Sequence, residues 1–337
     1  PPCGLLPTLN IYKPGTNDID KTIVTFQFID AATSIFNIKF DEDGNYIWHT
    51  TILSSADIAP VRGLLQTTNC VDSSGNLYIS FINSVIYSYT VYDKFDNEVY
   101  SFNNNKDLYF FTSLIKFDRD GSFIWSNYIL YNETYNGFTG FPVITCNNNN
   151  LYLQLNAATN NYLGGFDFYN ADALNNIVYS LPAKNIYLGD DINHSMLVKY
   201  DTDGNFNWAC TNGAYPIMGI SVITTSIVAD NDGHVYVSGA YAALFDSLYI
   251  WDVETNGPND DPKAELPGKD DFDIYLIKYN RYGLLNTNKH RNLYLEDNKL
   301  IPDGVDKSII ITNNDNKGPV DLLILDPLDA GYGYKVR

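Results

Sequence analysis

The chain has 337 residues, of which 45% are hydrophobic and 15% aromatic, enough to bury a substantial core. Its 21 Lys and Arg against 40 Asp and Glu give a net charge of −19, which would repel phosphate backbones and anionic membranes. We therefore expect no nucleic-acid partner and no membrane insertion, and no apolar run reaches the about 18 residues of a transmembrane helix.

The N-terminal part precedes any repeated pattern. Residues 1–19 are interpreted as an N-terminal extension, and the opening Pro1 in place of Met suggests a processed or partial version of a longer product. Residues 22–28 are rich in β-branched and aromatic side chains, which predicts a strand shortly before the first copy of a repeated phrase.

That phrase is Lys-aromatic-Asp/Asn-x-x-Gly, and it occurs four times. Successive lysines are 77, 83 and 79 residues apart, while the Lys-to-Gly distance is always five. The lysines are Lys39, Lys116, Lys199 and Lys278, and the glycines are Gly44, Gly121, Gly204 and Gly283. Four residues after the glycine stand Trp48, Trp125 and Trp208, with Thr287 in the fourth copy. Fixed internal spacing at long, similar intervals indicates a tandem structural repeat.

The phrase has the chemistry of a hairpin turn. Asp side chains accept hydrogen bonds from turn amides, and Gly tolerates the positive φ that reverses the chain. The Trp then lies on the returning strand, where its ring is predicted to fill the space between adjacent sheets.

A second phrase marks another strand in each unit, at residues 75–80, 149–154 and 233–238, where apolar and polar residues alternate. Spacing varies mainly after this strand, in inserts at about 83–110, 156–193 and 240–272. We expect these inserts to emerge on equivalent edges of the array, where loops are tolerated and where binding usually resides.

The pattern predicts an all-β fold without helices. We expect one repeat domain, 20–337, forming a β-propeller of four-stranded antiparallel blades, about five in number, with an open solenoid as the alternative. The approximate units are 20–55, 63–131, 140–211, 219–289 and 300–337. The ring is favoured because both terminal units look shortened, as if the two ends of the chain completed one blade.

One known family resembles these residues. The segments Gly233–Gly239, Phe245–Leu248 and Asp273–Asn280, together with the three Asp-x-Asp-Gly-x-x-x-Trp copies, resemble the SBBP-type (seven-bladed-propeller-like) repeat of bacterial surface proteins and giant DNA viruses. The matches cover most of residues 20–290, with departures at Thr287, at the 147–150 turn without Gly, and in the long inserts. The resemblance implies a non-catalytic display or interaction module.

Metal and catalytic sites have little support. A calcium loop would need an acidic residue where each phrase has its lysine, so we interpret the Asp residues as turn formers and expect no metal, cofactor or catalytic residue. The acidic insert is the weak exception, since carboxylates could gather around Ca²⁺ there. Those carboxylates are Asp260, Asp261, Asp270 and Asp271.

Cysteines and sequons leave alternatives open. The four cysteines, Cys3, Cys70, Cys146 and Cys210, allow three pairings, and buried free thiols are at least as plausible. Two sequons begin at Asn132 and Asn193, next to expected loops, as possible glycosylation sites.

These observations predict a non-enzymatic structural or recognition component on the exterior of a particle. The abundance of residues with AT-rich codons favours a giant-virus virion protein, located on the virion surface or outside the cell, with other virion or surface proteins as partners. A lectin-like, glycan-binding propeller is the alternative, with aromatic inserts 87–92 and 164–169 as candidate surfaces. A quinoprotein-like propeller enzyme is a third hypothesis, since Asp-x-x-Gly-x-x-x-Trp also occurs in that class, but its chains are much longer.

Overall fold

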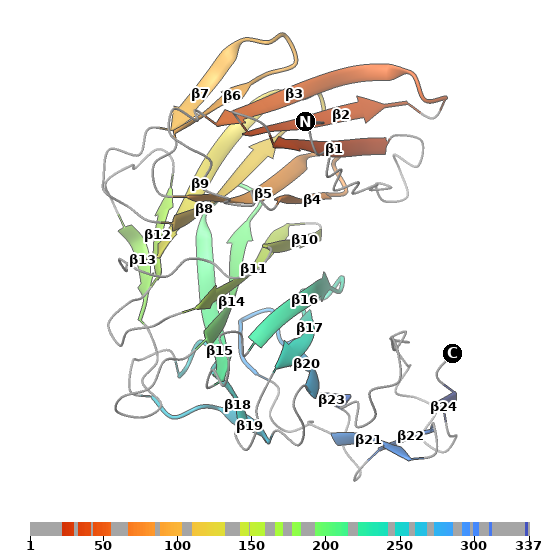
Figure 1. The fold of residues 1–337 in the computed structure, drawn as a ribbon, viewed down its shortest axis with the longest axis vertical. Coiled ribbons are helices and arrows are strands. Elements are labelled where there is room, and N and C mark those ends of the chain that lie inside the picture. Colours follow the sequence, from red (N-terminus) through yellow and green to blue (C-terminus); the bar gives the residue numbers. More distant parts are fainter. Residues whose placement is uncertain are drawn as a thin grey trace.

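The protein is all-β in the computed structural model, in which strands follow one another along a curved array (Figure 1). The described part of the chain contains no helix, and therefore no helix that could cross a membrane. The structure describes residues 22–29, 33–41, 43–54, 67–84, 88–102, 110–131, 142–147, 149–158, 166–170, 177–182, 193–214, 222–241, 247–255, 260–267, 273–285, 292–296, 299–302, 310–311 and 334–335. The expected N-terminal extension 1–19 and residue Thr287 lie outside these ranges.

The strands form five sheets, here called A to E. Sheet A contains β1 (Thr22–Ile29), β2 (Thr33–Phe40), β3 (Tyr46–Ser54), β6 (Tyr89–Tyr92) and β7 (Glu98–Phe102). Sheet B contains β13 (Ile177–Leu181), β12 (Phe166–Asn170), β9 (Phe123–Tyr131), β8 (Phe110–Phe117), β5 (Leu77–Ser84) and β4 (Thr67–Val71). Sheet C contains β10 (Val143–Asn147), β11 (Asn150–Ala158), β14 (Asn193–Asp201), β15 (Phe206–Ala214), β18 (Ser247–Ile250) and β19 (Ala264–Pro267).

The last two sheets are smaller in the described ranges. Sheet D contains β16 (Val222–Ala229), β17 (Val235–Tyr241) and β20 (Asp273–Tyr279). Sheet E contains β21 (Asn292–Glu296), β22 (Lys299–Pro302), β23 (Ile310–Ile311) and β24 (Tyr334–Lys335). All strand pairs are antiparallel except β21 with β23.

The inserts contain hairpins, and each hairpin joins the edge of the preceding sheet. Hairpin β6–β7 lies in the chain between β5 and β8 of sheet B, yet it pairs with β3 of sheet A. Hairpin β12–β13 likewise leaves sheet C to join β9 of sheet B, and β18–β19 leaves sheet D to join β15 of sheet C. Each hairpin pairs the backbone groups of an edge that would otherwise be exposed, and it ties consecutive repeats together.

The same exchange explains why the sheets are not uniformly four-stranded. The five sheets have five, six, six, three and four strands in the described ranges, because a donated hairpin adds two strands to each of the first three. In Figure 1 the donated hairpins follow one side of the curved array, and β4, β10 and β16 follow the other. The array therefore curves around the side on which β4, β10 and β16 lie.

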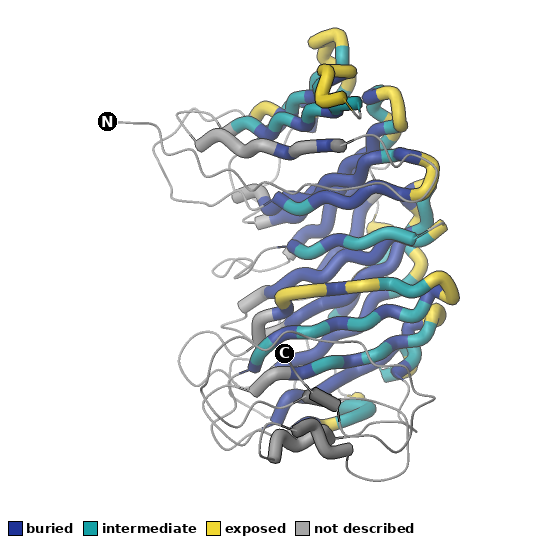
Figure 2. Tube along the Cα trace, turned by 90° about the vertical axis from the view of Figure 1, so that its right-hand side faces the viewer, coloured by how far each residue is buried: buried dark blue, intermediate teal, exposed yellow. Residues whose placement is uncertain are grey.

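Apolar residues fill the spaces between consecutive sheets. Strand β17 illustrates the reason, since its burial alternates along Val235–Tyr241 and the buried set faces sheet C. Similar clusters join sheet A to sheet B and sheet B to sheet C. Figure 2 shows buried residues through the middle of the stack, with exposed residues gathered at turns along one edge. Period-two patterning therefore places the core between the sheets.

Buried tyrosines predict loss of stability at alkaline pH. Burial, followed by the charge of Asp230, raises the pKa of Tyr152 to about 12, and burial raises that of Tyr275 to about 12. The ordinary pKa of tyrosine is 10.0, and both folded-state pKa values exceed it. The stabilisation of the fold by these two neutral tyrosines is therefore fully present below pH 10.0 and is lost as the pH rises through about 12. We expect unfolding followed by circular dichroism to accompany tyrosinate absorbance in that window, and Tyr152→Phe with Tyr275→Phe to move the transition to higher pH. An unchanged transition in the double variant would contradict the prediction.

Candidate functional site

Seven hairpin turns share one hydrogen-bonding pattern. In the turn that starts at Asp118, the amide of Gly121 donates to the Asp118 carbonyl at 3.0 Å, and the Asp118 amide donates to the carbonyl of Ser122 at 2.8 Å. Asp118 Oδ1 also accepts from the amides of Asp120 and Ser122 at 2.9 and 2.8 Å. The same pattern recurs at Asp41, Asp72, Asp93, Asp201, Asp230 and Asn280. The side chains read from the sequence as turn formers thus cap their own turns.

One copy of this turn escaped the sequence analysis. Asp96 occupies the glycine position of the turn that starts at Asp93 and takes a φ of 59°, which non-glycine residues seldom adopt. The six glycines at this position have φ between 79° and 87°. The repeated phrase in the sequence is defined by its Gly, and this turn lacks that mark because Asp96 stands at the glycine position.

The structure places Trp48, Trp125 and Trp208 in equivalent surroundings between consecutive sheets. Trp48 Nε1 of sheet A donates to the Arg119 carbonyl, in the turn of sheet B, at 3.2 Å. Trp125 donates to the Thr202 carbonyl and Trp208 to the Arg281 carbonyl, each at 3.2 Å. Each indole thereby reaches the first variable position of the next repeat's turn.

The repeated lysines bind the same carbonyls as the tryptophans. Nζ of Lys39 donates to the Arg119 carbonyl at 2.7 Å, and Nζ of Lys116 donates to the Thr202 carbonyl at 2.6 Å. Lys199 Nζ donates to the carbonyl of Arg281 at 3.0 Å. We call each Lys and Trp that share one turn carbonyl a clasp. The lysines lie directly across from the tryptophans in the sheet, which explains why the two side chains converge.

Turn glycines lie beneath the clasps at three of the four predicted positions. A Cβ built on Gly121 would lie 2.9 Å from Cδ2 of Trp48, and one on Gly204 would lie 3.0 Å from Cδ2 of Trp125. At Gly283 the nearest indole atom, in Trp208, would be 2.8 Å away. Gly44 has nothing within 4 Å. Sheet A therefore presents a turn of the same type without a clasp above it.

The sequence analysis missed the role of the lysines, which it used only to define the repeat and to argue against metal binding. Their side chains are buried, with Lys116 only 8% exposed, and the ammonium group lies 5.4 Å from the ring centroid of Tyr78. Lys199 lies similarly over Tyr152 at 5.6 Å. The constant five-residue spacing from Lys to Gly was the available signal, because it fixes the lysine on the strand that enters the turn.

Lys116→Met is expected to lower the free energy of unfolding by about 2 kcal/mol, since a charge-assisted bond to a largely covered carbonyl is lost. Lys94→Met is the matched control, because Lys94 lies over the exposed ring of Phe95 and should change stability by less than about 0.5 kcal/mol. Urea denaturation of both variants measures the difference. Equal effects would show that the clasp lysine does not stabilise the array.

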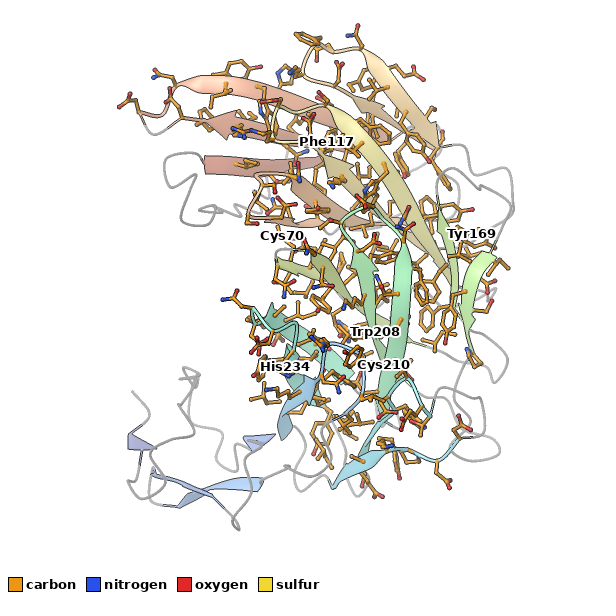
Figure 3. The ribbon with its side chains drawn as sticks, turned by 180° about the vertical axis from the view of Figure 1, so that it is seen from behind. Cys70, Phe117, Tyr169, Trp208, Cys210 and His234 are labelled. Atoms are coloured by element: carbon orange, nitrogen blue, oxygen red, sulfur yellow. The ribbon has the colours of Figure 1, made fainter. Side chains whose placement is uncertain are left out.

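The third clasp borders an open pocket of about 460 Å³ between sheets C and D. Figure 3 shows Trp208 between the strands of these two sheets. The lining residues are Lys199, Asn207, Trp208, Val253, Arg281 and Tyr282. Two of them are cationic, two are aromatic and none is acidic, in a chain with a net charge of −19. Burial, then the charge of Arg281, lowers the pKa of Lys199.

The segment after β18 forms one wall of this pocket. The Asp252 carboxylate is fully buried and accepts hydrogen bonds from the amides of Glu254 and Leu285 at 3.0 and 3.1 Å. The Val253 amide donates to the Gly283 carbonyl at 3.3 Å. Hydrogen bonds in both directions therefore fix the wall segment 252–253 to the turn segment 283–285 of sheet D.

Possible metal ligands are engaged in a turn or exposed. Asp230, Asp232 and His234 bring their ligand atoms within 4.8 Å of one another. However, Asp230 Oδ1 caps its turn and Oδ2 bonds to His234 Nδ1 at 2.9 Å. In the acidic insert, Asp260 and Asp261 are exposed. The other two expected carboxylates, Asp270 and Asp271, lie outside the described residues.

Most described aromatic residues of the inserts suggested for glycan binding are part of the core, while Tyr92 is partly exposed and Tyr87 lies outside the described residues. Tyr89 is 1% exposed, and Phe166, Phe168 and Tyr169 are likewise buried in the donated hairpins. These side chains cannot offer a sugar-binding face, which corrects the choice of candidate surfaces. Their hairpins pack on the preceding sheet, and this burial could not be inferred from composition.

The two sequons differ in what can be said of them. Asn193 is the first residue of strand β14 and pairs with both β11 and β15, while the Ser195 side chain of the same sequon is buried. Asn132 lies outside the described residues.

Cys70, Cys146 and Cys210 are not joined in disulfides, and Cys3 lies outside the described residues. Burial, then a hydrogen bond with Cys146, raises the pKa of Cys70. We expect alkylation of Cys70 in the folded protein to be at least about tenfold slower than after unfolding, because the thiolate is the nucleophile. Peptide mass spectrometry after timed alkylation measures this ratio, and equal rates in both states would contradict it.

These features define a class of protein, a tandem array of antiparallel sheets whose successive turns are clasped by the preceding sheet. Neither the scan against protein-family models nor the search of curated proteins finds a match to the chain.

Proposed function

We propose that the protein is a non-enzymatic structural or recognition component displayed on the exterior of a particle, a giant-virus virion. The observation that carries the proposal is the clasp, which occurs three times with the same donors and acceptor. The repeated Lys, Trp and Asp side chains serve packing and turn formation, which suits a scaffold. The acidic surface and the SBBP-like motifs support display outside the cell.

The array closes into a β-propeller of about five blades in this proposal. The unclasped turn at Gly44 supports closure, because equivalent glycines in the next sheets each lie under a Trp. Strand β1 supports it too, since among the described residues β1 is the edge of sheet A, whereas β5, β11 and β17 each have a further strand beside them. Class averages from electron microscopy should show a ring with a central channel. An open arc would favour the solenoid alternative.

Exposed apolar side chains on the donated hairpins support a recognition role. Phe95 is 71% exposed in the turn between β6 and β7, and Ile177 and Val178 of β13 are 48% and 42% exposed. Exposed apolar residues at the rim of an acidic protein suit contacts with other virion or surface proteins. This rim belongs to the inserts 83–110 and 156–193, which therefore remain the candidate working surface.

Mass spectrometry of purified virions against infected-cell cytosol tests the location. We expect the protein to be enriched with the particles and to become accessible to protease on intact particles. Recovery only from cytosol would overturn the display role. Deleting residues 251–272 would be a poor test of binding, because Trp251 and Asp252 are buried.

A lectin-like role is the second candidate, and one specific observation favours it. The pocket at the third clasp combines aromatic faces, an amide and two cations in an otherwise acidic protein. Concave sites with apolar walls and a few convergent polar groups are typical of small-molecule binding.

A further inference from the structure

We propose that the pocket at the third clasp binds a carboxylated sugar unit of a glycan, with Arg281 holding the carboxylate and Trp208 the apolar face of the ring. This inference rests on the recognition role proposed above and names the ligand class for it.

The charge of the lining selects an anion. Arg281 and Lys199 are the charged residues of the lining, and the salt bridges within the described ranges do not involve Arg281. The guanidinium group instead lies 4.7 Å from the ring centroid of Tyr282. A planar guanidinium in this state has paired donors for a carboxylate. Lys199 adds positive charge but already donates to the Arg281 carbonyl.

The two carboxylates beside Val253 in the chain already have partners. Glu254 follows Val253 in the chain, and its Oε2 accepts a hydrogen bond from Lys263 Nζ at 2.9 Å. Asp252 is fully buried behind the wall and binds backbone amides. Both carboxylates thus already accept hydrogen bonds from donors of the protein.

The aromatic groups select a ring with an apolar face. Tyr282 is 58% exposed and Trp208 is half-buried, so both are accessible to a ligand. The Trp208 ring is held in place by two contacts. Its Nε1 donates to the Arg281 carbonyl, and the Tyr152 ring packs against the indole with 6.2 Å between the ring centroids. A ring that is already fixed loses little conformational entropy on binding. Asn207 is exposed, and because its Nδ2 already donates to the Asn205 carbonyl at 3.2 Å, its Oδ1 is the polar partner for hydroxyl groups.

The other two clasps have different residues at the corresponding turn positions. The residue after the shared carbonyl is Asp120 in the first clasp and Asp203 in the second, where the third has Tyr282. A carboxylate at that position would repel an anion and provide no aromatic face. Arg119 shares the position of Arg281 but precedes Asp120, so the chain contains its own matched control.

Titration calorimetry with glucuronate, N-acetylneuraminate, glucose and inorganic phosphate tests the inference. We expect saturable binding of at least one acidic sugar, and binding of glucose weaker by about tenfold or more, because a charge-assisted contact is absent. Arg281→Gln should lose about tenfold or more in affinity while keeping its backbone carbonyl for the clasp. Arg119→Gln should bind as the parent does. A second variant, Tyr282→Asp, introduces the residue of the other two turns and should also lose binding.

Three outcomes would overturn the proposal. They are absence of saturable binding to both acidic sugars, phosphate binding as tight as that of the acidic sugars, and equal losses in Arg281→Gln and Arg119→Gln. Thermal melting of each variant establishes that the array remains folded. Absence of sugar binding would not affect the proposed virion location. Recovery of the protein only from cytosol would not affect a measured sugar affinity. The two proposals can therefore fail separately.

Discussion

Gly121→Ala is expected to lower the free energy of unfolding by about 3 kcal/mol, because the new methyl group meets two penalties. The backbone φ of 82° is unfavourable for alanine, and the Cβ would lie 2.9 Å from Cδ2 of the Trp48 indole. The indole cannot retreat without stretching its bond to the Arg119 carbonyl. Strain and overpacking therefore add at this position.

Gly44→Ala separates the two penalties. Gly44 has nearly the same φ, 81°, but nothing lies within 4 Å of its built Cβ. Only the backbone penalty of about 1 kcal/mol should remain. Urea denaturation of both variants gives the comparison, and equal losses would show that the Trp48 contact contributes nothing.

Trp48→Ala is expected to cost about 4 kcal/mol, since a large side chain is removed from a packed gap between sheets. Trp48 is 4% exposed, and its ring also lies under the ammonium group of Lys39 at 5.6 Å. Trp48→Phe should cost less, about 2 kcal/mol, because most of the packing remains while the hydrogen bond is lost.

Phe95→Ala provides the control within the same sheet. Phe95 is 71% exposed, so its removal should change the free energy of unfolding by less than about 1 kcal/mol. Chemical denaturation followed by circular dichroism applies to all three variants. A Trp48→Ala protein as stable as Phe95→Ala would refute the clasp as a source of stability.

The turns were predictable because their causes are local. Asp118 bonds to amides two and four residues ahead, and Gly121 supplies the required φ, so the five-residue sequence contains the whole explanation. Strand alternation is local in the same sense. The all-β class and the position of Trp48 between sheets follow from these short-range patterns.

The donated hairpins and the pocket were not predictable in this way. Hairpin β12–β13 pairs with β9, although residues of β10 and β11 intervene, and its alternation would suit either neighbouring sheet edge. The pocket joins Val253 to Arg281 and Trp208, which come from three separate segments. The alternation of apolar and polar residues along one segment does not determine which sheet edge a hairpin joins, or which loop contacts which turn.

The sequence by itself determined the repeat, the turns and the strand character, because these depend on residues within one hydrogen-bonded turn or one strand. Only the tertiary structure decided that Lys116 and Trp125 share the Thr202 carbonyl, and that each insert completes the preceding sheet. Contacts across about eighty residues depend on how edges and side chains compete for partners in space, and that competition is resolved only when the sheets stack.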